Sequence, residues 1–394
     1  MPDQESIFLK HTAQTTPFPL AIEVDYAKGL YIFDKQGKRY ADMVSGIGVS
    51  VVGHVHAKVI EAIKAQVDRH MHVMVYGEMI QQPVNDLAVK LTELLPENLT
   101  STYFVNSGTE ANEGALKLAK RVTGRRQLIG FKNGYHGHTH GSLSISSNEE
   151  KKRPFRPLIP CIDFLEFNDL SELSRITSST AAVIIEPIQG DAGVIIPPKK
   201  FMQELRDRCT QTGTILIFDE IQTGIGRTGT WFAFEQFDVV PDIISLAKGL
   251  GGGLPIGAFI ASYDHMIQLS HDPLLGHITT FGGNPVSATS ALATLKVIED
   301  EQLLAKVEQK GRLIENRLQH SKIIEIRRAG LMLAIELKSE DHVNRVIEYC
   351  LEHGVILFWF LSTRNAFRIS PPLTITEDQI LETTQVILDS LDKL

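Results

Sequence analysis

Cysteine is scarce in this chain of 394 residues, which contains only Cys161, Cys209 and Cys350. The three are far apart and none stands in Cys-x-x-Cys spacing, so zinc and dithiol redox motifs are not indicated. An odd number of cysteines is also no disulfide framework. We therefore expect reduced thiols and, with them, a protein of the cytoplasm.

Long apolar runs and an excess of positive charge are also lacking. No stretch approaches the roughly 18 apolar residues of a membrane span, and the first ten residues lack the charged-then-apolar pattern of a secretory signal. The net charge of -8 argues against nucleic acid and anionic membranes as partners, because both are bound through clustered Lys and Arg. No internal repeat or low-complexity linker is visible.

The middle of the chain alternates short β-branched runs with stretches of helical periodicity. A hairpin with strands at 30–34 and 38–43 and amphipathic helices at 56–70 and 83–95 are expected before it. Further helices are expected from Thr109 and from Pro198, with a long polar connection between 132 and 180. The expected strands are TYFVN, QLIGF, AAVIIE, TILIF and IISLA. This alternation predicts an α/β fold, with a parallel sheet and helices on both faces.

The pattern of apolar residues changes after Gly283. A long helical pattern runs from 285 to 320 with a break near Asp300, and a further helix is expected at 340–353. Strand-like runs surround that helix, and a last helix begins near Thr376. This part of the chain predicts a compact α+β unit.

Two of the expected strands are followed by a single charged residue. Asp219 ends the run that begins at Thr214, and Lys248 follows IISLA. Ligands of parallel sheets bind at the carboxyl ends of the strands, so this carboxylate and this amine are placed to face one small molecule. Pyridoxal phosphate requires such a pair, an amine to bond to its aldehyde and an acid to keep its ring nitrogen protonated.

The alternative is that the lysine caps a strand and the aspartate caps a helix. The glycines that follow each residue weigh against it: Gly224, Gly226, Gly229, Gly249, Gly251, Gly252 and Gly253.

The turn Ser107-Gly108-Thr109 lies between an expected strand and an expected helix. Free backbone N–H groups and the positive end of the dipole favour a phosphate at a helix N-terminus. The alternative is an ordinary capping box, in which Glu110 or Glu113 reaches back to the cap. The motif alone leaves both interpretations open.

The segment FDEIQTGIGRTG followed by PDIISLAKGLGGGLPIGA closely resembles the class III pyridoxal-phosphate-dependent aminotransferases, which include the ornithine, acetylornithine and 4-aminobutyrate enzymes. The likeness extends from GLYIFDKQGKRYADM to FRISPPLTIT. It implies the fold type I of these transferases, with a large cofactor-binding domain at 51–285 and a small domain formed by 1–50 and 286–394. It also implies a homodimer with active sites at the subunit boundary.

The resemblance assigns roles to cofactor-binding residues. It makes 107–109 the phosphate loop, places Tyr135 on the pyridine face and puts Glu186 near the ring beside Asp219. It assigns Gln222 to the phenolic oxygen and Thr280 to the phosphate held by the neighbouring subunit. The full set is Ser107, Gly108, Thr109, Tyr135, His136, Glu186, Asp219, Gln222, Lys248 and Thr280.

The run His136, His138 and His140 invites a metal interpretation, but no Cys, Asp or Glu stands at ligand spacing nearby. We expect no metal, and histidines that face water or the substrate channel.

For the substrate, the resemblance implies that Arg368 grips a carboxylate through two parallel hydrogen bonds. The alternative is a surface ion pair. Two positions depart from the family pattern: His138 stands where an arginine for a distal carboxylate is usual, and Asp191 where a glutamate partner of the clamp arginine is usual. The shorter Asp191 either still reaches Arg368 or leaves it free. Tyr76 and Trp359 are expected to line the substrate channel.

The expected function is transfer of an amino group, from the terminal (ω) position of a substrate such as ornithine, acetylornithine or 4-aminobutyrate, to 2-oxoglutarate by a ping-pong mechanism. Lys248 would act as general base and Asp219 would hold the ring nitrogen. The alternatives are an aminomutase or decarboxylase on the same cofactor, and a pyridoxal-phosphate-binding protein without turnover. The sequence does not identify the amino donor.

Overall fold

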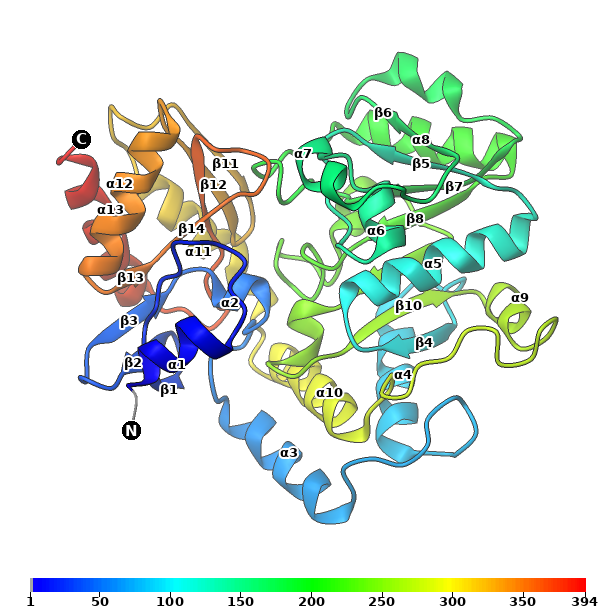
Figure 1. Cartoon of the computed structure of the whole chain (residues 1–394), viewed down its shortest axis with the longest axis horizontal. Coiled ribbons are helices and arrows are strands. Elements are labelled where there is room, and N and C mark those ends of the chain that lie inside the picture. Colours follow the sequence, from blue (N-terminus) through cyan, green and yellow to red (C-terminus); the bar gives the residue numbers. More distant parts are fainter. Residues whose placement is uncertain (1–2) are drawn as a thin grey trace.

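The computed structural model describes residues 3–394, and a seven-stranded sheet forms the centre of its larger part (Figure 1). The strand order is β4-β10-β9-β8-β7-β5-β6. β10 runs antiparallel to β4 and β9, and the other neighbouring strands are parallel. The strands are β4 (Ser101–Val105), β5 (Gln127–Phe131), β6 (Ile162–Leu165), β7 (Thr180–Ile185), β8 (Ile215–Asp219), β9 (Ile243–Leu246) and β10 (Gly257–Ala261).

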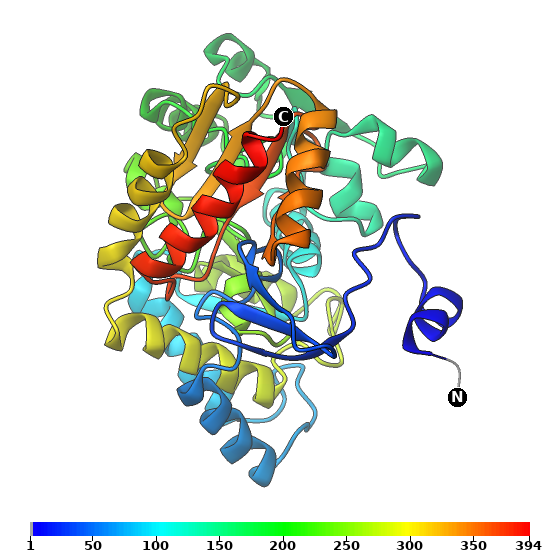
Figure 2. The same ribbon diagram turned by 90° about the vertical axis from the view of Figure 1, so that its left-hand side faces the viewer.

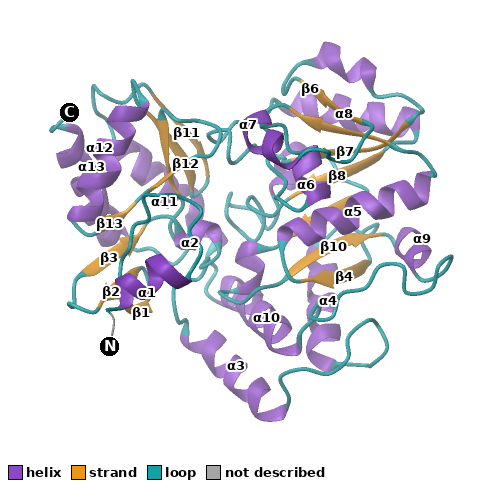
Figure 3. Ribbon diagram, in the orientation of Figure 1, coloured by secondary structure: helices purple, strands orange, loops and turns teal. Residues whose placement is uncertain are grey.

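Both faces of this sheet are buried, as the continuous apolar strands predict. Successive residues of β8 belong to different hydrophobic clusters: Leu216 and Phe218 to one, Ile215 and Ile217 to the other. Helix α5 (Gly108–Thr123) packs against β10, β9 and β7, and α8 (Lys199–Thr212) packs against β8. Figure 3 shows helices on both sides of the strands. The expected α/β architecture with a mostly parallel sheet is therefore confirmed.

Two strands of the sheet are absent from the sequence-based prediction. β6 lies in the stretch expected to be a polar connection and pairs with β5 at the edge of the sheet. Because an edge strand is less covered than a central one, β6 is only partly buried and lacks a long apolar run. β10 is a short run that directly follows the glycine-rich segment after Lys248. Its pairing is visible only in the folded chain.

The smaller part contains two four-stranded sheets, ordered β1-β2-β3-β13 and β11-β12-β15-β14. β13 pairs in parallel with β3, so a C-terminal strand completes an N-terminal hairpin. In Figure 2 the blue strands of this hairpin lie beside the orange and red helices α12 and α13. The strands are β1 (Val24–Lys28), β2 (Tyr31–Asp34), β3 (Arg39–Asp42), β11 (Glu325–Ala329), β12 (Met332–Glu336), β13 (Val355–Ile356), β14 (Phe358–Trp359) and β15 (Ala366–Ile369).

Helix α10 packs against α3 and α4, beside the turn that carries Lys248. Helix α1 has no buried residue and stands apart from the body of the molecule in Figure 2. Besides α5 and α8, the α-helices have the following bounds: α1 (Gln4–His11), α2 (Ser45–Gly48), α3 (Ala57–Arg69), α4 (Gln82–Leu94), α6 (His140–Ile145), α7 (Glu149–Lys152), α9 (Tyr263–Met266), α10 (Pro285–Asp300), α11 (Leu304–Arg317), α12 (Glu340–Glu352) and α13 (Glu377–Leu391). The 3-10 helices are η1 (Arg153–Phe155), η2 (Leu170–Arg175), η3 (Ala233–Phe237), η4 (Lys248–Gly251) and η5 (Ile267–Leu269). Within residues 3–394, no helix combines the length and the apolar character that crossing a membrane requires.

Gly114 allows α5 to pack closely on β10, because a Cβ at this position would lie 2.2 Å from Cε1 of Phe259. Alanine normally favours a helix over glycine by about 1 kcal/mol. Overpacking costs about 1–3 kcal/mol or more and should win at this distance. We expect Gly114→Ala to lower the free energy of unfolding, measured by urea denaturation. In the double variant Gly114→Ala/Phe259→Leu, the effects should be less than additive, and strict additivity would contradict this packing argument.

Candidate active site

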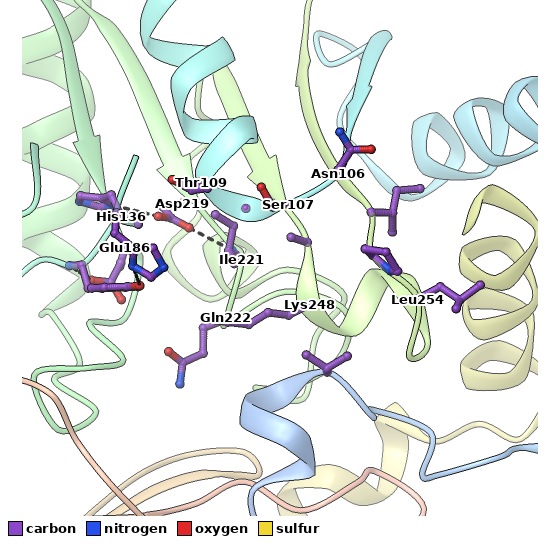
Figure 4. Close-up of a pocket in the computed structure, with 18 of the residues that line it drawn as sticks. Asn106, Ser107, Thr109, His136, Glu186, Asp219, Ile221, Gln222, Lys248 and Leu254 are labelled. Carbon is purple, nitrogen blue, oxygen red and sulfur yellow. Dashed lines mark hydrogen bonds and ion pairs between the residues drawn. The ribbon is translucent and has the colours of Figure 1, made fainter. Parts of the chain in front are cut away.

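The carboxyl ends of four parallel strands border one cavity of about 470 Å³. Asp219 is the last residue of β8, Lys248 follows β9, Glu186 follows β7 and Ser107 follows β4. Figure 4 shows these side chains around the cavity. The lining residues are Val49, Asn106, Ser107, Gly108, Thr109, Tyr135, His136, Gly137, His138, Glu186, Asp219, Ile221, Gln222, Ala247, Lys248, Gly253, Leu254, Pro255 and Ile256.

Asp219 is buried and held by three donors. Its Oδ2 accepts hydrogen bonds from Asn112 Nδ2 and from His136 Nδ1, each at 2.8 Å. Its Oδ1 accepts one from the backbone N–H of Ile221 at 3.1 Å. Figure 4 marks the contacts with His136 and Ile221. A carboxylate fixed in this way keeps its orientation, and Oδ1 retains capacity for a further partner on the cavity side.

His136 borders the cavity but is not exposed to water. It is buried, its backbone N–H donates to Ser146 Oγ at 2.9 Å, and its ring bonds to Asp219. His138 and His140 are exposed, as expected. Among residues 3–394 no group of three His, Cys, Asp or Glu side chains is arranged to hold a metal ion.

Asn112 was missed at the sequence level. It lies on α5, fully buried, and its amide bridges the carbonyl oxygen of His136 at 2.9 Å and Asp219. The sequence could have indicated it, because Asn112 stands four residues after Gly108 and so lies one turn further along the same face of the helix. A polar residue on the inward face of a helix requires a buried partner.

Lys248 extends into the cavity from the turn after β9. Burial lowers the pKa of its amine, and Arg368 lowers it further, whereas Asp219, Glu186 and Asp191 act in the opposite direction. The left-handed turn at α2 packs against this side chain: a Cβ on Gly48 would lie 3.8 Å from Lys248 Cδ. A lysine with a lowered pKa has more of the neutral amine that bonds to a carbonyl.

The N-terminus of α5 borders the cavity. Ser107 caps the helix by accepting from the N–H of Glu110 at 3.3 Å, which is half of a capping box. Glu110 does not complete the box, because its carboxylate accepts from Asn106 instead. Gly108 has no room for a side chain, since a Cβ would lie 2.7 Å from Ile221. The cap and the anion site are therefore compatible in one turn.

Glu186 ties together two loops at the cavity wall. Its Oε1 accepts from the N–H of Tyr135 at 3.0 Å and its Oε2 from the N–H of Gly190 at 2.9 Å. Burial raises its pKa to about 7. Burial also raises the pKa of the Tyr135 hydroxyl to about 12, so this ring stays neutral. Gln222 packs over Gly190, where a Cβ would lie 2.3 Å from Gln222 Oε1.

Arg368 and Asp191 form a buried ion pair, with 3.0 Å between Nη2 and Oδ1. This answers the question that the shorter side chain of Asp191 raised: it does reach the arginine. Arg368 is not a surface residue, and burial lowers its pKa while Asp191 acts against this. The pair lies close enough to Lys248 to influence its amine electrostatically.

Of three other predicted residues, one borders the cavity and two do not. His138 borders the cavity but bonds through Nδ1 to the hydroxyl of Tyr135, at 3.0 Å. Tyr76 and Thr280 do not border this cavity, and their hydroxyl oxygens lie 3.5 Å apart beside a different pocket. Within one chain the structure brings together Lys248, Asp219, the turn at 107–109 and Tyr135 around the cavity. The predicted residues that do not line it are Tyr76, Asp191, Thr280, Trp359 and Arg368.

The arrangement defines a class of site. A partly buried lysine with a lowered pKa, a buried and fixed aspartate and the N-terminus of α5 share one cavity at the carboxyl edge of a mostly parallel sheet. These groups fit the aldehyde, ring nitrogen and phosphate of pyridoxal phosphate.

Comparisons with known proteins agree with that class. The sequence model described as aminotransferase class-III matches residues 12–391. An acetylornithine aminotransferase of Methanopyrus kandleri is 38% identical over 99% of this chain and 99% of its own. One of Corynebacterium efficiens is 39% identical over 95% of this chain and 93% of its own. The solved structure of the Toxoplasma gondii ornithine aminotransferase superposes with a TM-score of 0.91 at 28% identity, covering 98% of this chain and 93% of the other. The chain therefore belongs to the class III aminotransferase family, and its cofactor is pyridoxal phosphate.

The carboxyl of Glu220, next to Asp219, should make stability depend on pH. Burial raises its pKa to about 7, although hydrogen bonds from Thr223 and the N–H of Phe234 lower it. An ordinary Glu titrates near pH 4.3, so the folded state binds more protons between about pH 4 and 7, and stability falls as pH rises through that window. We expect Glu220→Gln to flatten the fall measured by urea unfolding of the apoprotein from pH 5 to 8. The exposed Glu204→Gln is the control, and an unchanged slope in Glu220→Gln would contradict the assignment.

Proposed function

We propose that this aminotransferase moves the terminal amino group of an ornithine-like or acetylornithine-like donor to 2-oxoglutarate. The observation that carries the proposal is one cavity with Lys248 and Asp219 on its wall and the buried Arg368 within electrostatic reach of the lysine. The relatives that support the donor class are those named as acetylornithine and ornithine aminotransferases. Such a donor has an amine at one end and a carboxylate at the other. The amine would react at the cofactor held by Lys248, and the carboxylate would bind the guanidinium of Arg368.

In this proposal each group holds one part of the cofactor. The N–H groups at 107–109 hold the phosphate, Tyr135 covers the ring face, Gln222 contacts the phenolic oxygen and Asp219 keeps the ring nitrogen protonated. Glu186, Asn112 and His136 support these contacts from behind. When bound, pyridoxal phosphate supplies an aldehyde that takes up amines and a ring that accepts electrons from the substrate carbon.

Lys248 has two tasks. Its amine anchors the cofactor, and after release its Nζ moves a proton at the substrate carbon as general base and acid. Burial lowers its pKa, which brings the neutral and charged forms closer in free energy and suits both directions of that transfer. Asp219 is too firmly hydrogen-bonded to serve as the mobile base.

Arg368 binds the carboxylate of the substrate in exchange for Asp191. His138 is hydrogen-bonded to Tyr135 and offers a polar contact, without a fixed cation, to the far end of the substrate. The donor pocket is thus less selective for a second carboxylate than one with an arginine at this position would be.

We further propose that residues 51–285 act as the large domain and that 1–50 with 286–394 act as the small domain. The pairing of β13 with β3 supports the second assignment. We also propose a homodimer in which Thr280, with Tyr76, serves the neighbouring site. Their place outside the cavity of their own chain supports this. A cytoplasmic location is proposed from the unpaired thiols of Cys161, Cys209 and Cys350.

Replacing Lys248 by alanine should abolish covalent cofactor retention. Wild-type protein should show a visible absorption band that borohydride bleaches while fixing the cofactor to the chain, so that the cofactor remains attached after denaturation. Lys248→Ala should release its cofactor on denaturation even after borohydride treatment. Lys310→Ala, which removes another buried lysine with a lowered pKa, is the control and should keep the band. Cofactor that stays attached to denatured Lys248→Ala after borohydride treatment would refute the role of this lysine.

A panel of ω-amino acids, diamines and α-amino acids, each with 2-oxoglutarate, tests the reaction. We expect glutamate to form with ω-amino donors, because 2-oxoglutarate becomes glutamate only when it receives the amino group of the donor. An aminomutase or decarboxylase would consume the donor without glutamate, and a mere binding protein would not consume it. Reaction with ordinary α-amino acids alone would overturn the ω-amino assignment.

The Thr280→Val variant should bind pyridoxal phosphate roughly ten- to 100-fold more weakly, because a hydrogen bond to a charged group contributes about 1.5–3 kcal/mol. Refolding a mixture of Thr280→Val and Lys248→Ala chains should restore activity that neither variant has at low cofactor concentration. One mixed site then contains Lys248 from one chain and Thr280 from the other. Failure of the mixture to recover would contradict the shared site.

A further inference from the structure

Asp191 is held by more than Arg368. Its Oδ1 accepts from the backbone N–H of Leu361 at 2.8 Å as well as from Arg368. Its Oδ2 accepts from the hydroxyl of Ser362 at 2.9 Å. The loop after β14 thus supplies two of the three donors around this buried carboxylate.

Arg368 is engaged on several sides. Its Nε donates to the carbonyl oxygen of Trp359 at 3.1 Å, and its guanidinium lies 4.6 Å from the ring centroid of Phe360. These contacts fix the arginine in place. A substrate carboxylate therefore comes to a stationary guanidinium and competes with Asp191 for its N–H groups.

The result of that competition depends on the state of Asp191 afterwards. A buried carboxylate that loses its cation is costly unless hydrogen bonds remain to it. Leu361 and Ser362 can stay bonded to Asp191 when a substrate carboxylate takes the N–H groups of Arg368. The hydrogen bonds from Leu361 and Ser362 therefore stabilise the Asp191 carboxylate more in the substrate-bound state than in the free state.

We propose that Ser362 is a positioning residue that sets the affinity for carboxylate-bearing substrates, acting through Asp191. Its hydroxyl holds Asp191 when the substrate takes Arg368. The inference rests on the proposed function, because it takes Arg368 as the carboxylate clamp. Ligands without a carboxylate leave the Arg368–Asp191 pair intact and do not depend on Ser362.

The test measures binding of glutarate, an unreactive dicarboxylate, to the holoenzyme by calorimetry. Ser362→Ala should raise the Kd of glutarate, and the Michaelis constant of the keto acid acceptor, about tenfold, as expected for a lost hydrogen bond to a charged group. Ser362→Thr keeps the hydroxyl and should restore most of the affinity. The Kd of pyridoxal phosphate and the visible band should be unchanged in both variants.

Thr363→Ala is the matched control. Thr363 lies in the same loop, and its hydroxyl donates to the carbonyl oxygen of Ala192 at 2.7 Å, without contact to the Asp191 carboxylate. Loosening of the loop would affect Thr363→Ala and Ser362→Ala alike, whereas the proposed role affects only the latter.

Two results would overturn the inference: a glutarate Kd that is unchanged in Ser362→Ala, or one that rises equally in Thr363→Ala. A wild-type holoenzyme that binds no glutarate would also overturn it. Failure of the proposed function is distinct, because it appears as wild-type protein that forms no glutamate with any donor.

Discussion

The burial of one carboxylate, Asp219, constrains the rest of the site. A charge at this depth is stable only with several donors, and the fold supplies them from α5, from the loop before α6 and from its own backbone. Each donor brings another functional segment with it. Asn112 shares its helix with the phosphate turn, and His136 adjoins Tyr135. Satisfying one buried anion thereby fixes the positions of the turn at 107–109, Tyr135 and Asp219 relative to one another.

A second buried carboxylate, Asp191, connects two parts of the molecule. It joins the loop after β7 to the loop after β14 and to Arg368 on β15. These contacts link the seven-stranded sheet with the sheet that contains β14 and β15. Under the proposed function, a substrate that takes Arg368 from Asp191 would change these contacts, and so substrate binding would affect the packing between the two sheets.

Much of the fold could be predicted because its signals are local. The strands around Ile217 and Ile244 are continuous apolar runs, since the sheet is buried on both faces. β6 could not be predicted in the same way, because an edge strand has no such run and is defined by its partner β5. Lys248 and Asp219 were predictable because strand ends of a parallel sheet converge. Asn112 and Ser362 were not, because their importance lies in partners 107 and 171 residues away in the sequence.

By itself, the sequence determined the alternation of strands and helices, the place of Asp219 and Lys248 at strand ends and the family resemblance, because periodicity, strand-end charges and glycine-rich turns are properties of short segments. Only the tertiary structure decided that His136 is a buried partner of Asp219, that Asp191 reaches Arg368, and that Tyr76 and Thr280 lie outside the cavity of their own chain. The reason is physical. Which oxygen a donor reaches, and how much water remains around it, depends on segments that meet only after the chain has folded.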